Sequence, residues 1–295
     1  MSYRSIFAPD LFAGKTALIT GGGTGIGRCV AHELASLGAH VVIAGRRKEP
    51  LEETVAEIAE DGGAASYVQM NIRDEEAVQA VIKEVVADRG AIDLLVNNAG
   101  GQFASPASAI RAKGWKAVVE TNLNGTFWVT QAVFNASMSK SGGSVVNVIA
   151  EMRNGFPGMA HTGAARAGVD NLTKSLAVEW ARHGVRVNSI APGNILSSGM
   201  TTYPEAFLKM ALPMLRGNPS ARMGTEAEVS AAVVFLLSPA SAFTTGATLW
   251  VDGGSSLCKV PFVPLDKHDK MQPWSGFHRP TELPAVLKDD SLKDD

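Results

Sequence analysis

A cluster of glycines follows the first predicted strand, in the run TGGGTGIG at residues 20–27. Glycine permits a tight turn and lets the backbone approach a diphosphate closely, while the start of the next helix presents unpaired N–H groups and a positive dipole to that anion. Such a cluster also suits an ordinary turn, but the strand before it, the helix after it and a second strand favour a nucleotide site. The run therefore predicts that the chain binds a dinucleotide.

The end of the second predicted strand carries no acid and is followed by Arg46 and Arg47. A carboxylate about 20 residues beyond the glycines would bind a ribose 2′-hydroxyl, whereas arginine accommodates a 2′-phosphate. A planar guanidinium donates two hydrogen bonds to a phosphate at once. Two solvated charges at a helix start are the ordinary alternative. The pair favours NADP(H) as the coenzyme.

Short β-branched segments alternate with longer amphipathic segments along the chain, and this alternation sets the fold class. It implies parallel strand pairing with right-handed crossovers, hence a doubly wound α/β sheet with helices on both faces. The predicted strands are Lys15–Thr20, His40–Ala44, Ser66–Met70, Ile92–Val96, Ser144–Ile149, Val185–Ile190 and Thr248–Val251. The predicted helices are Gly25–Leu37, Pro50–Asp61, Asp74–Arg89, Lys113–Ser139, Ala164–His183 and Glu226–Leu237.

Two parts of the chain differ in composition. Residues 1–255 form one predicted dinucleotide-binding domain, because no internal repeat or linker interrupts the pattern before about Gly254. Residues 256–295 contain Pro261, Pro264, Pro273, Pro280 and Pro284, which break regular structure, and end in KDDSLKDD. We expect an extended C-terminal tail whose last residues are disordered.

Composition and charge narrow the possible functions. The chain has 295 residues, 45% of them hydrophobic, and a formal net charge of −2, so it offers no basic field for nucleic acid or for a membrane surface. No stretch approaches the roughly 18 apolar residues of a membrane span, and the first residues lack a secretory apolar core. Cys29 and Cys258 have no metal-ligand spacing, so we expect no metal site and a reducing, cytoplasmic location.

Several motifs occur in a fixed order: TGGGTGIG at 20–27, NNAG at 97–100, Asn122 in TNLNG, and Pro192-Gly193 after the sixth strand. This series resembles the short-chain dehydrogenase/reductase family over about residues 14–254. The resemblance implies a seven-stranded Rossmann sheet and a homotetramer. The coenzyme-binding residues that we expect are Gly21, Thr24, Gly25, Ile26 and Gly27 at the diphosphate, Arg46 and Arg47 at the 2′-phosphate, Asn71 and Ile72 beside the adenine, Asn98, Ala99 and Gly100 along the cleft, and Arg166, Pro192, Gly193 and Ile195 toward the nicotinamide.

The chain departs from this family at the usual catalytic group, a Tyr-x-x-x-Lys pair aided by an upstream serine. Thr162 aligns with the tyrosine, Arg166 with the lysine, and Ile149 or Ala150 with the serine. A tyrosine phenol works there because its pKa is lowered toward neutrality, and a threonine hydroxyl cannot follow it. Reversible oxidation of an ordinary alcohol is therefore poorly supported.

A narrower resemblance is to peroxisomal trans-2-enoyl-CoA reductases and the related 2,4-dienoyl-CoA reductases. It is carried by NNAGGQFASPAS at 97–108, ETNLNGTF at 120–127 and HTGAARAGVDNLTKSLAVEWA at 161–181. It implies hydride delivery from NADPH to C3 of a 2-enoyl thioester, with an acyl-CoA or another small apolar molecule as substrate. The enolate that forms on the thioester oxygen needs hydrogen-bond donors rather than a tyrosinate.

Three residues are the candidate catalytic group that this resemblance implies. Asn122 would order a water in the proton path, Thr162 would donate to the thioester carbonyl, and Arg166 would hold the nicotinamide ribose, because that task needs only donors. Kink stabilisation for Asn122 and helix capping for Thr162 are the structural alternatives. The titratable candidates for proton supply are Glu151, His161 and Asp170, of which His161 is expected to precede its helix and to face solvent.

The long connection Leu196–Asn218 is predicted to hold a short helix and suits a substrate lid. Its apolar side chains would accept an acyl chain, and three basic residues in or near it would meet CoA phosphates; an ordinary surface helix fits the segment equally well. The apolar residues are Met200, Tyr203, Phe207, Met210 and Met214, and the basic ones are Lys209, Arg216 and Arg222.

Two other functions remain open from sequence. One is a dehydrogenase of acyclic, citronellol-like terpene alcohols or of other alcohol or carbonyl substrates. The other is a non-catalytic NADP(H)-binding protein. The missing Tyr, Lys and Ser favour the non-catalytic protein over the alcohol dehydrogenase, whereas the presence of Asn122, Thr162 and Arg166 favours the enoyl-CoA reductase over both.

Overall fold

Seven parallel strands form the central sheet in the residues that the computed structural model describes, which are 3–258, 265 and 267–288. Their order across the sheet is β3-β2-β1-β4-β5-β6-β9. The order reverses between β1 and β4, and a doubly wound sheet binds its ligand at such a point, beyond the carboxyl ends of the strands. The strands are β1 (Thr16–Thr20), β2 (His40–Gly45), β3 (Ala64–Gln69), β4 (Leu94–Asn97), β5 (Gly143–Val148), β6 (Val185–Pro192) and β9 (Thr248–Val251).

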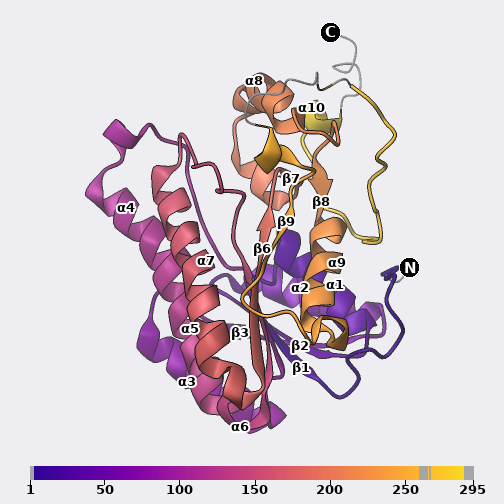
Figure 1. Cartoon of the computed structure of the whole chain (residues 1–295). Helices are drawn as coiled ribbons and strands as arrows, with labels where there is room; N and C mark the ends of the chain where they lie inside the picture. Colours follow the sequence, from indigo (N-terminus) through magenta and orange to yellow (C-terminus); the bar gives the residue numbers. More distant parts are fainter. Residues whose placement is uncertain (1–2, 259–264, 266, 289–295) are drawn as a thin grey trace.

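Helices cover both faces of this sheet (Figure 1). On one face lie α1 (Gly25–Ser36), α2 (Lys48–Glu60) and α9 (Glu226–Leu237). On the other lie α3 (Glu75–Arg89), α5 (Gly125–Val133) and α7 (Ala160–Trp180). The doubly wound Rossmann fold expected from sequence is therefore confirmed, and all seven predicted strands are found with small shifts of their ends.

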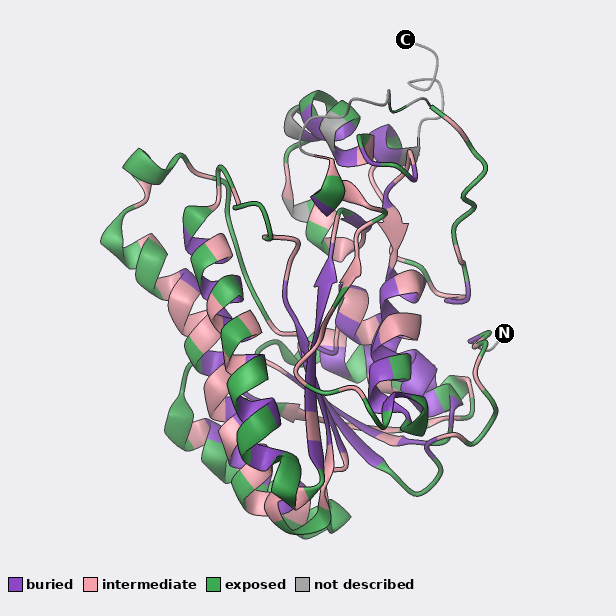
Figure 2. Ribbon diagram, in the orientation of Figure 1, coloured by how far each residue is buried: buried purple, intermediate pink, exposed green. Residues whose placement is uncertain are grey.

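Each strand divides its side chains between two cores. In β1, Ala17 and Ile19 pack with α1, α2 and α9, whereas Leu18 packs with α3, α5 and α7. Figure 2 shows the strands buried at the centre and the outer helix faces exposed. The apolar residues on both sides of each strand must be covered by helices. A binding site can therefore be formed only by the loops at the ends of the strands.

The long helix expected over Lys113–Ser139 is not regular. It is formed by α4 (Ala112–Val119), α5 and α6 (Ser139–Ser141), joined by π-helical turns at Glu120–Asn124 and Phe134–Met138. The first turn contains the buried side chain of Asn122. A π-turn adds a residue to the helical repeat and so changes the direction of the side chains it contains, which periodicity alone did not reveal.

The connection after β6 also has structure of its own. Strands β7 (Ile195–Leu196) and β8 (Gly224–Thr225) pair in parallel as a separate two-stranded sheet. Between them lies α8 (Glu205–Arg216), which is the short helix expected there. Near the end of the described tail is α10 (Ala285–Lys288), beside α8 in Figure 1.

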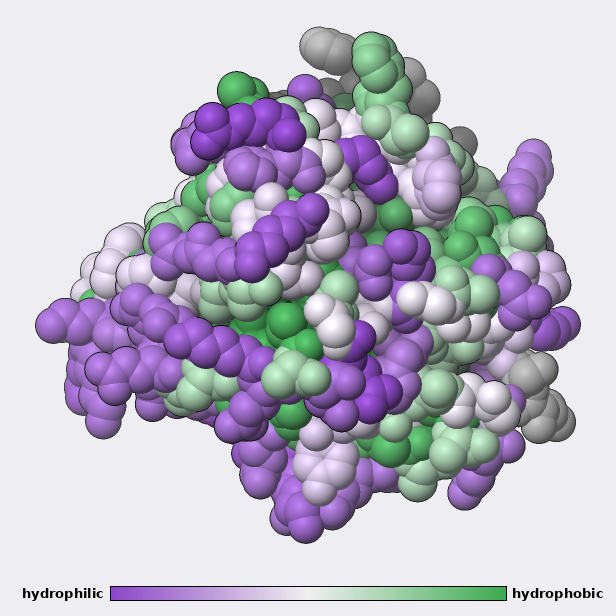
Figure 3. All heavy atoms as spheres, turned by 90° about the horizontal axis from the view of Figure 1, so that it is seen from below, coloured by the Kyte–Doolittle hydropathy of each residue, from purple (hydrophilic) through white to green (hydrophobic). Residues whose placement is uncertain are grey.

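The tail forms no helix or strand from residue 267 to 284. Pro261 and Pro264 lie outside the described residues, and so do residues 289–295, where disorder was expected. The division at residue 255 stays a prediction. No helix in the described ranges combines the length and the apolarity needed to cross a bilayer. From below, groups of apolar side chains lie between hydrophilic ones on the surface (Figure 3).

A chain of buried amides and hydroxyls crosses the sheet and fixes the helices on it. The Asn97 amide donates to Thr130 Oγ1 of α5 at 2.7 Å and to Asn147 Oδ1 of the next strand at 2.8 Å. The Asn147 amide in turn donates to Thr173 Oγ1 of α7 at 2.9 Å. All four side chains are buried, so losing one partner leaves polar groups without hydrogen bonds.

We therefore expect Asn147→Ala to lower the free energy of unfolding by about 2–4 kcal/mol, because the change leaves the Asn97 amide and the Thr173 hydroxyl each short of a partner. Urea unfolding followed by circular dichroism measures this. Asn171→Ala, at an exposed position of α7, is the control and should change stability by less than about 0.5 kcal/mol. Equal effects of the two substitutions would contradict the structural role of this network.

Candidate functional site

The glycine-rich turn after β1 has the geometry of an anion site. Gly21 and Gly25 have φ angles of +67° and +58°, which side chains rarely adopt. A Cβ added to Gly21 would lie 2.9 Å from the Asn98 amide nitrogen. Thr24 makes no side-chain cap, and the first turn of α1 holds no acid. The first N–H groups of the helix are therefore left for a ligand.

Gly27 has a different part in the same turn. It lies inside α1, and a Cβ there would meet the Gly21 carbonyl oxygen and the Asn98 amide. The Asn98 amide donates to the carbonyl oxygens of Thr20 and Gly21 at 3.1 and 3.2 Å. Gly27 thus allows the helix to pack closely on the turn, and NNAG fixes the turn from the neighbouring strand.

A cleft of about 530 Å³ opens at this edge of the sheet, where the strand order reverses. Most of the residues expected around a coenzyme line it: Gly21, Thr24, Gly25, Ile26, Arg46, Arg47, Asn71, Ile72, Asn98, Ala99 and Gly100. Sequence reasoning missed several other lining residues, among them Gly23, Arg73, Thr121, Ser197, Ser198 and Gly199. Of these, Ser197–Gly199 could have been found, because they begin the long connection predicted to cover the site.

Arg46 and Arg47 lie at the mouth of the cleft, where β2 ends and α2 begins. Both side chains are exposed, and within the described part of the chain neither guanidinium forms an ion pair. Arg73, at the same cleft, is different because it is paired with Glu120. The two unpaired guanidiniums leave positive charge available to an anion at this end.

A buried cation lies behind Gly100, which lines the cleft; Arg166 itself, like Asn122 and Thr162, is not among the lining residues. Arg166 of α7 is 9% exposed, and its Nη1 donates to the Val148 carbonyl oxygen at 2.9 Å. Its Nε has no partner, and no carboxylate of the described residues pairs with it. Burial lowers the pKa of Arg166 to about 10, so it is still charged at neutral pH.

Asn122 and the cleft-lining Gly100 lie next to this cation. A Cβ added to Gly100 would meet the Arg166 guanidinium and would lie 2.8 Å from Asn122 Oδ1. The Asn122 amide donates to the carbonyl oxygens of Gly101 at 2.7 Å and of Val118 at 2.9 Å. Asn122 thus satisfies the backbone opened by the π-turn and holds the loop after β4. The kink-stabilising role considered from sequence is present.

Thr162 lies one helical turn before Arg166 and is completely buried. Its backbone N–H donates to His161 Nδ1 at 2.8 Å, and its hydroxyl oxygen lies 3.3 Å from the same nitrogen. Since Nδ1 accepts this hydrogen bond, a neutral imidazole there carries its proton on Nε2. His161 Nε2 is buried and has no partner among the described residues.

The expectation that His161 precedes the helix and faces solvent is wrong. The helix begins at Ala160, earlier than the predicted Ala164, and His161 is 0% exposed. The Phe103 ring lies edge-on against it, with 4.4 Å between the ring centroids. Four residues of polar or small type at the start of the helix hid this boundary, because they carry no apolar period.

The other two titratable candidates differ in their surroundings. Asp170 pairs with Lys174 and accepts a hydrogen bond from Thr248, so it is used in structure. Glu151 has one buried oxygen without a partner. Burial, and then the charge of Asp252, raise the pKa of the Glu151 carboxyl. Of the three titratable candidates, Glu151 and His161 therefore have a buried atom without a partner among the described residues.

In the segment after β6, the cleft is lined by the loop at Ser197 and Ser198 and not by Pro192. Pro192 ends β6 and Ile195 is buried in β7, while Ser197 and Ser198 line the cleft. Pro192, Gly193 and Ile195 are not among the lining residues. A Cβ on Gly193 would lie 2.8 Å from the Asp252 backbone, so this glycine permits close packing against the strand end.

The basic residues expected at CoA phosphates are mostly engaged elsewhere. Arg222 binds Glu228 at 2.6 Å, and Arg216 donates to the Leu287 carbonyl oxygen at 3.5 Å. Lys209 is exposed and pairs with Glu205 one turn earlier on α8. Met210 is 74% exposed, and the side chains of Phe207 and Met214 lie outside the described ones.

The geometry can be compared with known proteins. Residues 21–256 match the sequence model of a family described as enoyl-(acyl carrier protein) reductase. A relative from Bacillus subtilis (strain 168), named as a probable (2E)-enoyl-CoA-producing 2,4-dienoyl-CoA reductase, is 40% identical over 84% of this chain and 99% of its own length.

Solved structures agree with this grouping. A citronellol catabolism dehydrogenase from Pseudomonas aeruginosa PAO1 is 52% identical, with a TM-score of 0.76 over 86% of this chain and 100% of its own. A putative 2-deoxy-D-gluconate 3-dehydrogenase from Agrobacterium tumefaciens, solved with bound NADP, is 36% identical, with a TM-score of 0.76 over 84% of this chain and 99% of its own. Together with the fold and the glycine-rich turn, these matches show that the chain belongs to the short-chain dehydrogenase/reductase family of oxidoreductases.

Proposed function

We propose that the protein is an NADPH-dependent reductase of trans-2-enoyl-CoA thioesters, or of a closely similar conjugated thioester. The cleft fits the coenzyme in three ways. Gly21 and Gly25 form a cradle that side chains would fill, the start of α1 leaves its N–H groups unpaired, and Arg46 and Arg47 offer unpaired charge for a 2′-phosphate. A related structure solved with NADP supports this choice.

The observation that carries the proposed chemistry is the buried Arg166 cation, which pairs with no carboxylate in the described part of the chain. NADPH supplies the hydride that C3 of the substrate receives. Arg166 binds the nicotinamide ribose, and its charge also favours the enolate that develops on the thioester oxygen, because attraction between charges is stronger away from water. The proton that C2 takes comes from water, and Asn122 would order that water through its Oδ1, since both of its amide protons are donated to backbone carbonyls.

Thr162 is the proposed hydrogen-bond donor to the thioester oxygen. Its hydroxyl is buried one turn from Arg166 and next to a histidine nitrogen. It lacks the acidity to exchange a proton with an alcohol, but donating to a developing oxyanion requires only an oriented O–H. Reduction of a conjugated double bond therefore fits these residues better than oxidation of an alcohol.

A second candidate follows from one comparison. The solved structure of 52% identity is titled a citronellol catabolism dehydrogenase, which favours an acyclic terpene compound as substrate. The dienoyl-CoA reductase relative favours the thioester. Both names are compatible with a small apolar substrate. A non-catalytic NADP(H)-binding protein is the third possibility.

Assembly and location also stay proposals. We propose a homo-oligomer, with a tetramer as the expected form, and exposed apolar side chains on α4 and α7 support it: Trp115 is 43% and Val178 is 80% exposed. A cytoplasmic location remains our expectation from sequence.

An activity assay separates the three functions. We expect NADPH absorbance at 340 nm to fall when the protein is mixed with 2-enoyl-CoAs of several chain lengths, with a kcat of about 1–10³ s⁻¹. No turnover there, with NADP⁺ reduced by terpene alcohols, would favour the dehydrogenase. Tight NADPH binding with no turnover of either substrate class would indicate a non-catalytic protein.

Removing both guanidiniums at the mouth of the cleft should change coenzyme preference. We expect Arg46→Ala/Arg47→Ala to raise the Kd of NADPH about 100-fold, since each lost charge-assisted contact costs about 1.5 kcal/mol, and to change that of NADH less than about threefold. Isothermal titration calorimetry measures both. Lys140→Ala/Arg182→Ala removes the same charge around α6, away from the cleft. Equal losses for the two coenzymes would refute 2′-phosphate recognition.

The role of the Thr162 hydroxyl can be tested with a substitution that keeps the size of the side chain. We expect Thr162→Val to lower kcat about 10- to 100-fold, because it removes one donor to the oxyanion, with the Kd of NADPH unchanged. Thr162→Ser keeps the hydroxyl and should retain most of the activity. Wild-type kcat in the valine variant would assign this threonine to helix structure alone.

A further inference from the structure

The tail crosses the side of the domain that contains the glycine-rich turn after β1, residues 20–27, which we call the coenzyme turn. The tail begins after the two glycines that follow β9, and the family model ends at residue 256, so it lies beyond the matched region. Its described part crosses the start of α9, where Thr225 donates to the Trp274 carbonyl oxygen at 2.8 Å and the Trp274 N–H donates to Glu228 at 3.2 Å. It then passes α1 and α2 and ends on α8 (Figure 1).

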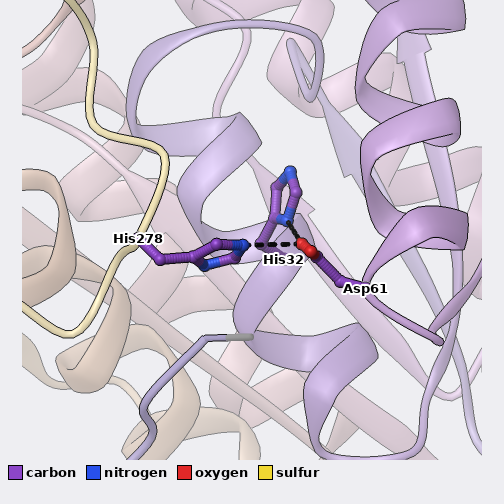
Figure 4. Close-up of side chains that lie close together, drawn as sticks. All are labelled: His32, Asp61 and His278. Carbon is purple, nitrogen blue, oxygen red and sulfur yellow. Dashed lines mark hydrogen bonds and ion pairs between the residues drawn. The ribbon is translucent and has the colours of Figure 1, made fainter. Parts of the chain in front are cut away.

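A charged cluster anchors the middle of this tail to α1 and α2. His278 Nε2 lies 2.8 Å from Asp61 Oδ2, and His32 Nδ1 lies 3.3 Å from the same oxygen (Figure 4). Arg279 pairs with Asp61 at 3.2 Å and with Glu60 at 2.9 Å. These contacts join side chains from three segments that are far apart in sequence.

The two histidines and Asp61 also have the composition of a metal site, with candidate ligand atoms within 4.8 Å of one another. However, Arg279 is already paired with Asp61, and its Nε lies 3.3 Å from His278 Nε2. A divalent cation would have to share these ligands with a guanidinium, at a Coulombic cost. The cluster is better explained as an ion-pair anchor for the tail.

Apolar packing adds to this anchor. The Phe277 side chain is 6% exposed and is buried with Tyr3, Cys29 and Ala227. The Arg28 guanidinium lies 5.3 Å from the Phe277 ring centroid and donates to the Arg279 carbonyl oxygen at 2.9 Å. The tail is therefore fixed at its middle by both charge and burial.

Beyond this anchor, the tail contacts the buried carboxylate of Glu226, which lies beside the coenzyme turn. Glu226, the first residue of α9, is 4% exposed and accepts a hydrogen bond from Thr281 Oγ1 at 3.1 Å. Burial raises the pKa of this carboxyl, while the Thr281 hydroxyl, the Arg28 charge and then the nearby backbone N–H groups of Ser198 and Thr281 lower it. A Cβ on Gly25 would lie 2.9 Å from Ser198 Oγ and 3.9 Å from Glu226 Oε1.

The end of the described tail covers α8. Val286 and Leu287 of α10 are each 5% exposed and pack in one apolar cluster with Leu208, Leu212 and their neighbours on α8. Leu196, Met200 and Tyr203, which precede α8, pack against the same cluster. The segment that lines the cleft at Ser197–Gly199 is thus connected to α10 on one side and to Glu226 on the other.

We propose that the tail is a strap that holds the segment 196–216 over the coenzyme cleft. Glu226 is the positioning residue, because it lies between the tail, the coenzyme turn and this segment. The inference rests on the proposed function only in assigning the substrate to this cleft. It explains why a carboxylate is buried beside an anion site: Glu226 accepts a hydrogen bond from Thr281 of the tail and lies beside Gly25 and Ser198.

Two variants loosen the strap at different points. Val286→Asp/Leu287→Asp introduces charge where α10 packs on α8, and Thr281→Val removes a donor to Glu226 while keeping the side-chain size. Leu265→Asp/Met271→Asp makes the same kind of change at tail positions that are 41% and 52% exposed, and is the matched control.

The expected result is selective. The double aspartate variant should raise the KM of the enoyl-CoA on the order of tenfold, because misplaced binding groups lose much of their effect, and Thr281→Val should raise it by a smaller factor. The Kd of NADPH should change less than about twofold in both variants. Limited proteolysis without substrate should cut residues 196–216 on the order of tenfold faster. The control should match wild type in each measurement.

Proteolysis keeps this test separate from the proposed reaction. If no enoyl-CoA is turned over but the variants are cut faster within 196–216, the strap stands and the proposed reaction fails. Unchanged cleavage and unchanged KM in both variants would overturn the strap. Cleavage throughout the chain together with lost NADPH binding would also overturn it, since the tail would then stabilise the whole domain rather than one segment.

Discussion

Burial of the parallel sheet on both faces is the constraint on which the rest of the molecule depends. Because neighbouring residues of β1 such as Leu18 and Ile19 enter different cores, both faces must be covered by helices. Functional groups can then gather only where strands end. Thr20 pairs in register with Asn97, and Asn97 with Asn147, so the coenzyme turn and the NNAG segment emerge side by side.

The positive charge of the cleft comes from arginine side chains that have no acidic partner among the described residues. Arg28, Arg222 and Arg279 are paired with carboxylates and hold structure together. Arg46 and Arg47 at the mouth, and Arg166 behind Gly100, have no acidic partner among the described residues. A protein keeps unpaired positive charge next to free helix N–H groups where an anion will balance it. Other cations, such as Lys113 and Arg182, also lack an acidic partner among the described residues, so it is their position at the cleft that distinguishes Arg46 and Arg47.

The reaction that we propose depends on hydrogen-bond donors rather than on a titrating acid. Thr162 and Arg166 stand where the resemblance places a tyrosine and a lysine, and neither exchanges a proton near neutrality. The residues suit stabilisation of charge on a carbonyl oxygen, which is what reduction of a conjugated thioester requires.

The sequence by itself determined the fold class, the turn that faces the coenzyme and the charge at the mouth of the cleft. These depend on local periodicity, on glycine conformation and on residues adjacent in the chain, which are readable one segment at a time. The tertiary structure decided the π-turn that directs Asn122 inward, the burial of His161, and the path of the tail to Glu226 and α8. Each of these results from contacts between residues far apart in sequence, such as Thr281 with Glu226, and no local pattern encodes such a pairing.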